Sequence, residues 1–105
     1  SYILEVIEAA ENYPRIAQKM KPVDRLLFLV LCRQENPFSK ELMERVGKET
    51  NVKGVQSNIQ RALQRLSEQH LVSRIAKGEY HIEKPGLKRF IEHHYPEAIG
   101  HKKGA

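Results

Sequence analysis

The sequence predicts a mainly helical domain that carries one small β-hairpin. Apolar residues recur at helical spacing in several segments, and the longest of these amphipathic patterns covers residues 55–69. After it, two short segments of strand composition, 71–76 and 80–82, flank a turn that contains glycine. The 105 residues suit a single domain, and their content of 40% hydrophobic and 30% charged residues is that of a globular protein.

Three helices are predicted in the first third of the chain. Apolar spacing indicates helices over 2–12, 14–20 and 23–35, and the second and third each begin beside a proline. The third contains Leu26–Cys32, the longest uninterrupted apolar run, which has a single β-branched residue. Because the flanking residues extend this run to helical length, we interpret it as a central helix that is covered on most sides.

A fourth helix is predicted to follow Ser39. Serine is a suitable N-cap, and Phe38 and Met43 are spaced to pack together as a hydrophobic staple. We expect this helix to end at residue 48. Gly47 and the polar residues after it predict a turn before the next helix.

The helix predicted over 55–69 has two contrasting faces. Five apolar residues fall on one stripe and are expected to face the core: Val55, Ile59, Ala62, Leu63 and Leu66. Opposite them lie Ser57, Gln60, Arg61 and Gln64, flanked by Asn58 and Arg65. The sequence has no acidic residue from Thr50 to Ser67, whereas the charges of the preceding helix balance.

The remaining residues are predicted to form the hairpin and a closing helix. Lys77-Gly78 suits the tight turn between the strands. A last helix over 85–95 would bury Leu87, Phe90 and Ile91. We therefore divide the chain into an N-terminal helical extension, a central domain and a basic tail, covering residues 1–21, 22–95 and 96–105.

This order of elements is that of a winged helix–turn–helix domain with extra helices at both ends. In such domains the last helix of the motif enters the major groove of DNA, and the hairpin is the wing. Residues 36–90 carry eleven basic and six acidic side chains, which accounts for the whole net charge of +5. Charge alone is compatible with a polyanion-binding surface or with solubility.

We therefore expect the 55–69 helix to contact duplex DNA, with the wing assisting. Glutamine and asparagine can read adenine edges, and arginine can read guanine or bind phosphate. The expected DNA-binding residues are Lys53, Gln56, Ser57, Asn58, Gln60, Arg61, Gln64, Arg65, Arg74 and Lys77. Lys53 and the backbone amides of Gly54 and Val55 would lie near phosphate.

Several stretches also resemble a known family: Met20–Leu27, Val55–Leu66, His70–Val72 and Gly78–Ile82. They are similar to the C-terminal winged-helix domain of archaeal-type P-loop ATPases, which are related to the AAA+ and STAND groups. The resemblance implies that a nucleotide-binding domain precedes this segment in a longer parent protein. The present sequence contains no Gly-x-x-x-x-Gly-Lys-Ser/Thr loop, so we do not expect it to bind ATP itself.

A second hypothesis keeps the fold without DNA binding. In it the domain is a regulatory or protein-docking module that binds a protein partner, or the ATPase domain of a parent chain, through the helices of residues 2–20 or the same polar face. The short, weakly charged wing favours this hypothesis, whereas the glutamine-rich helix favours DNA.

Other classes of function find no support in the sequence. No set of residues forms a catalytic constellation, so we expect neither an enzyme nor a cofactor or small-molecule substrate. His93 and His94 point about 100° apart on a helix, which does not suit a metal pair. Cys32 is expected to be a small buried hydrophobe. The apolar run is far shorter than the ~20 residues of a membrane span, so we expect no membrane partner. The single cysteine and the lack of a basic-then-apolar leader favour a cytoplasmic domain.

Overall fold

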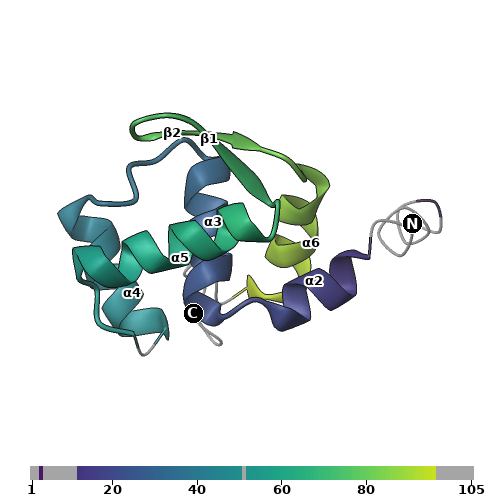
Figure 1. Cartoon of the computed structure of the whole chain (residues 1–105). Helices are drawn as coiled ribbons and strands as arrows, with labels where there is room; N and C mark the ends of the chain where they lie inside the picture. The colour runs from purple at the N-terminus through teal and green to yellow at the C-terminus, as the bar shows by residue number, and fades with distance from the viewer. Residues whose placement is uncertain (1–2, 4–11, 51, 97–105) are drawn as a thin grey trace.

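A computed structural model of the chain describes residues 3, 12–50 and 52–96. The elements follow in the order α2 (Tyr13–Lys19), α3 (Pro22–Cys32), α4 (Lys40–Thr50), α5 (Gln56–Glu68), β1 (Val72–Ala76), β2 (Glu79–Ile82) and α6 (Gly86–His94) (Figure 1). The described part is thus mainly helical with a small antiparallel hairpin, as predicted. The helix predicted over 2–12 and the basic tail lie outside the described residues, apart from Ile3, Asn12 and Pro96.

Helix α3 is the centre of the core. Leu26, Leu27, Phe28, Leu29 and Val30 are each at most 1% exposed, so this helix is buried around most of its circumference. It contacts α4, α5, α6 and β2, and Figure 1 shows α5 crossing in front of it. The interpretation of the apolar run as a central covered helix is confirmed.

One continuous hydrophobic core joins all the described helices to the hairpin. Helix α2, from the predicted extension, contributes Tyr13 and Ala17 to it, and Met20 follows directly. The stripe of α5 contributes Ile59, Ala62, Leu63 and Leu66, and α6 contributes Leu87, Phe90 and Ile91. Val55, predicted on the same stripe, is instead the N-cap residue of α5 and is 45% exposed, because its extended backbone lies outside the helical periodicity.

Helix α4 begins at the predicted cap but is longer than predicted. The Leu42 amide donates to the Ser39 hydroxyl at 3.2 Å, which confirms Ser39 as the capping residue. The helix continues through Gly47 to Thr50, so the prediction of a turn at Gly47 was wrong. A Cβ atom at Gly47 would lie 3.8 Å from the Gly54 amide nitrogen, so the glycine lies where the chain returns past α4.

The hairpin is anchored at one end and exposed at the other. Val72 pairs with Ile82 and Arg74 with Tyr80, and an irregularity in the register follows Arg74. Lys77-Gly78 forms the predicted turn, in which Gly78 has a φ of 78°. Val72 is buried, whereas the rest of β1 is exposed.

One ion pair links α6 to the C-cap residue of α3, and a second lies within α6. The Glu92 carboxylate accepts from Arg33 at 3.1 Å and from Lys88 at 3.0 Å. Burial opposes ionisation of Glu92, but the hydrogen bonds from Lys88 and Arg33 outweigh it and lower the pKa of this carboxyl group. Within the described residues no helix combines the length and apolar character that crossing a membrane requires.

The two faces of α5 predict opposite responses to alanine substitution. Leu63 is 3% exposed, so Leu63→Ala should lower the free energy of unfolding by about 2–5 kcal/mol through lost apolar burial and packing. Arg61 is exposed, so Arg61→Ala should change the free energy of unfolding by less than about 0.5 kcal/mol. Urea denaturation followed by circular dichroism measures both variants. Equal losses of stability would contradict the orientation of α5.

Candidate nucleic-acid interface

Helix α5 presents a continuous polar face to solvent. Apolar residues recur every three or four positions and attach one side of the helix to α3, which leaves the other side free. Five of the residues expected to bind DNA are exposed there: Gln56, Ser57, Gln60, Arg61 and Gln64. None of these five is acidic, so the face offers amide and hydroxyl groups together with one cation.

A groove separates α5 from the hairpin and brings residues of both elements together. Gln56, Gln60 and Gln64, spaced four residues apart, line the side that α5 forms. Arg74 and Lys77 line the side that the hairpin forms. The complete lining is Phe38, Gln56, Gln60, Leu63, Gln64, Ser67, Arg74, Lys77, Gly78 and Tyr80. It has two cations and no acidic side chain, so the groove is electropositive.

The N-terminal end of α5 adds a further positive feature. Val55 caps the helix without a side-chain hydrogen bond, and the first turn contains no acidic residue. Lys53 is exposed just before this end. Asn58, which we expected on the DNA surface, donates from its side-chain amide to the Lys53 carbonyl at 3.0 Å. Asn58 therefore orders the loop that leads into α5, and the positive end of the helix dipole lies beside Lys53.

Arg65 lies on a different side of α5 from the groove. Its Nε and Nη2 atoms donate to the two carboxylate oxygens of Asp24 on α3, at 3.0 and 2.7 Å. Asp24 is 1% exposed, and its hydrogen bonds to Arg65 raise the pKa of the guanidinium group. Arg65 therefore differs from the expected DNA-binding residues that line the groove, because its guanidinium group neutralises a buried carboxylate.

Phe38 and Tyr80 line the groove although the sequence analysis did not assign them to the site. Tyr80 lies directly opposite Arg74 in the hairpin, so both side chains project from the same face of the strands. Phe38 lies in the loop before α4, where its amide donates to the Asn36 side chain at 2.9 Å. The sequence distance between these aromatic residues concealed their proximity to one groove.

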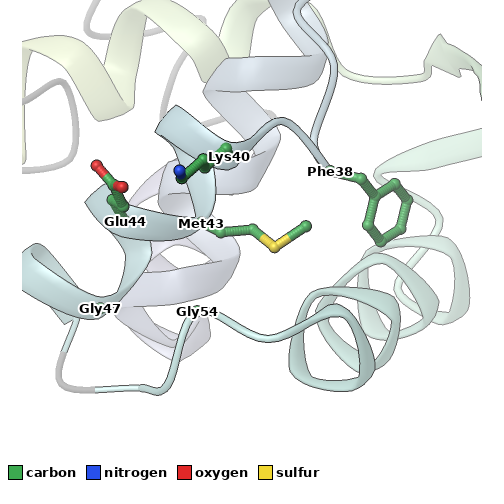
Figure 2. Close-up of a pocket in the computed structure, with 6 residues that line it drawn as sticks. All are labelled: Phe38, Lys40, Met43, Glu44, Gly47 and Gly54. Atoms are coloured by element: carbon green, nitrogen blue, oxygen red, sulfur yellow. The ribbon is translucent and has the colours of Figure 1, made fainter.

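Phe38 also borders a second pocket, on the side of α4. This pocket is lined by Phe38, Lys40, Met43, Glu44, Gly47 and Gly54, and Figure 2 shows the Met43 side chain directed toward the Phe38 ring. The two residues predicted as a hydrophobic staple thus lie at the same pocket. A Cβ atom on Gly54 would clash with the Met43 carbonyl oxygen, so the backbone before α5 lies directly against α4.

Groups with possible catalytic chemistry lie away from this surface. Cys32 is half-buried, and burial raises the pKa of its thiol from 9.0 to about 11, so the unreactive protonated form prevails at neutral pH. Within residues 12–50 and 52–96, no three His, Cys, Asp or Glu side chains gather where they could hold a metal ion.

Comparisons of the chain with protein-family models, with curated proteins and with solved structures find no match. Function is therefore inferred from the chemistry of the surface that α5 and the hairpin form.

Proposed function

We propose that this domain is a winged helix–turn–helix that binds duplex DNA. In this proposal α4 and α5 are the helix–turn–helix, α5 enters the major groove, and the β1–β2 hairpin is a wing that contacts the DNA backbone. The observation that carries the proposal is the groove lined by the α5 glutamines and the hairpin cations. Base-reading and phosphate-binding groups thereby share one surface.

The side chains divide into two chemical roles. Gln60, Arg61 and Gln64 are exposed on α5 and have the donors and acceptors that recognise base edges. Lys53 and Lys77 are exposed at the start of α5 and at the hairpin turn, where point charges suit phosphate. Arg65 takes no part, since its guanidinium group is held by Asp24.

The resemblance to archaeal-type ATPases extends the proposal to a parent protein. In that setting this domain would attach DNA to a preceding nucleotide-binding domain. The exposed face of α5 and the hairpin tip supports such an arrangement, because neither surface is needed to complete the core.

A protein-docking function is the second candidate, and the far side of the hairpin favours it. Ile75 is 66% exposed, and it lines a hollow with Leu31, Gln34 and Glu35 at the end of α3. Glu35 and Glu79 on this side would repel phosphate, and an exposed isoleucine suits a protein partner.

The salt dependence of duplex binding tests the proposal. Fluorescence anisotropy with a labelled duplex should show an affinity that falls steeply between about 0.05 and 0.15 M salt. The reason is that lysine and arginine side chains release counterions from the DNA when they bind its phosphates. Lys77→Ala should weaken binding to all sequences and flatten the slope of log affinity against log salt by about one. Gln60→Ala should instead change the preference between sequences by about 1–3 kcal/mol.

Lys19→Ala is the matched control, since it removes the same charge from α2. Its affinity and salt slope should equal those of the unchanged domain. At about 0.15 M salt, charges are screened beyond roughly 8 Å. If the folded domain did not bind duplex DNA under these conditions, the protein-docking function would be favoured over DNA binding.

A further inference from the structure

The groove between α5 and the hairpin contains chemistry that base-edge recognition does not use. Its apolar lining consists of the rings of Phe38 and Tyr80 together with Leu63. Both aromatic side chains are half-buried and line the groove, while Phe38 also borders the pocket beside α4 and Tyr80 the hollow that contains Ile75. The ring faces of Phe38 and Tyr80 cannot hydrogen-bond to base edges in a duplex, so their place in the groove suggests another contact.

Polar groups from both α5 and the hairpin complete the groove. The α5 side carries the amide of Gln60 between two further glutamines, and the hairpin side carries Arg74 and Lys77. The cavity measures about 580 Å³, within the range of about 300–1,000 Å³ for sites that enclose a small organic group. A ligand suited to it has flat apolar faces, hydrogen-bonding edges and negative charge.

We propose that this groove binds single-stranded nucleic acid, with bases against Phe38 and Tyr80 and phosphates beside Arg74 and Lys77. Unpaired bases stack on aromatic side chains while a cationic groove follows the backbone. Bases within a duplex are already stacked on one another, so their faces are unavailable to these rings. The inference rests on the proposed nucleic-acid function of the same surface and adds unpaired strands to its ligands.

An acidic peptide is the competing ligand, and it fits the groove less completely. Its carboxylates would pair with Arg74 and Lys77, but it would leave Phe38 and Tyr80 without a stacking partner. A nucleotide uses the rings, the amides and the cations together.

Tyrosine fluorescence provides a direct test, since the chain has four tyrosines and no tryptophan. Titration with a thymidine oligonucleotide of about 12 residues, in the size range of single-strand sites, should quench this fluorescence. Tyr80→Leu and Phe38→Leu should each weaken binding roughly 5- to 150-fold through lost stacking. Tyr80→Phe keeps the ring, so it should keep the affinity while losing most of the quenching.

The titrations distinguish a failure of single-strand binding from a failure of the proposed nucleic-acid function. Unchanged oligonucleotide affinity in Tyr80→Leu and Phe38→Leu, with duplex binding intact, would overturn single-strand binding alone. Failure to bind either nucleic acid would overturn both, and so would binding of oligo-glutamate in their place. Circular dichroism checks the fold of each variant. If Tyr80→Leu does not fold, Phe38→Leu and the quenching titration of the unchanged domain decide the outcome.

Discussion

Arg65→Ala is expected to lower the free energy of unfolding by about 3–5 kcal/mol, because it leaves a buried carboxylate without its cation. Asp24 is 1% exposed, and both of its oxygens accept from Arg65 at 2.7 and 3.0 Å. Without the guanidinium group, the carboxylate would lie between α3 and α5 without these two hydrogen bonds. Urea denaturation followed by circular dichroism measures the loss, and Arg61→Ala on the same helix is the control for removing an exposed arginine.

The reciprocal variant should cost less. Asp24→Ala leaves an arginine that is 30% exposed and can turn to water, so we expect a loss of about 1–3 kcal/mol. The double variant should then be more stable than Arg65→Ala alone, since it leaves no unpaired buried charge. If Asp24→Ala proved the more damaging single change, the carboxylate would be the group that reaches solvent.

Gly54→Ala should lower the free energy of unfolding by about 3 kcal/mol, the upper range for overpacking. The added Cβ would clash with the Met43 carbonyl oxygen and would lie 2.6 Å from its carbonyl carbon. Both atoms belong to the α4 backbone, so no side-chain rotation relieves the clash. The loop before α5 would have to move, and we expect weaker DNA binding as well as a lower thermal midpoint.

Gly47→Ala is a matched control of opposite sign. Gly47 lies within α4, and its added Cβ would make an ordinary contact of 3.8 Å with Gly54. Alanine should therefore stabilise the helix by about 0.5–1 kcal/mol. A Gly54→Ala variant as stable as the unchanged domain would show that the loop before α5 is not in direct backbone contact with α4.

Local sequence patterns predicted the elements well because their causes are local. The apolar period of α5, the Ser39 cap and the Lys77-Gly78 turn each depend on neighbouring residues. The end of α4 could not be predicted this way, since the return of the chain at Gly54 determines what surrounds Gly47. Val46, beside the glycine, is buried in the core, and the helix continues past Gly47 despite the weak helix propensity of glycine.

The residues of the candidate site could be predicted only where the helical period alone determines whether a side chain is exposed. Gln60 and Arg61 lie where the period places them, whereas Arg65 binds a carboxylate 41 residues earlier. One clue was available in the sequence, because an aspartate at the start of a helix covered on most sides needs a cation nearby. The grouping of Phe38 with Tyr80 had no such clue, as it arises from the packing of the hairpin against α5.

The anchoring of the hairpin gives the two sides of the groove different mechanical properties. Helix α5 buries four apolar side chains in the core, so its backbone holds the Cα positions of the exposed glutamines in place. A two-stranded ribbon is marginal by itself, and this one is buried at Val72 but exposed toward its turn. Arg74 and Lys77 therefore belong to a unit that opens at low free energy. The hairpin side of the groove can therefore move relative to the α5 backbone, so the width of the groove can adjust while the helix itself stays in place.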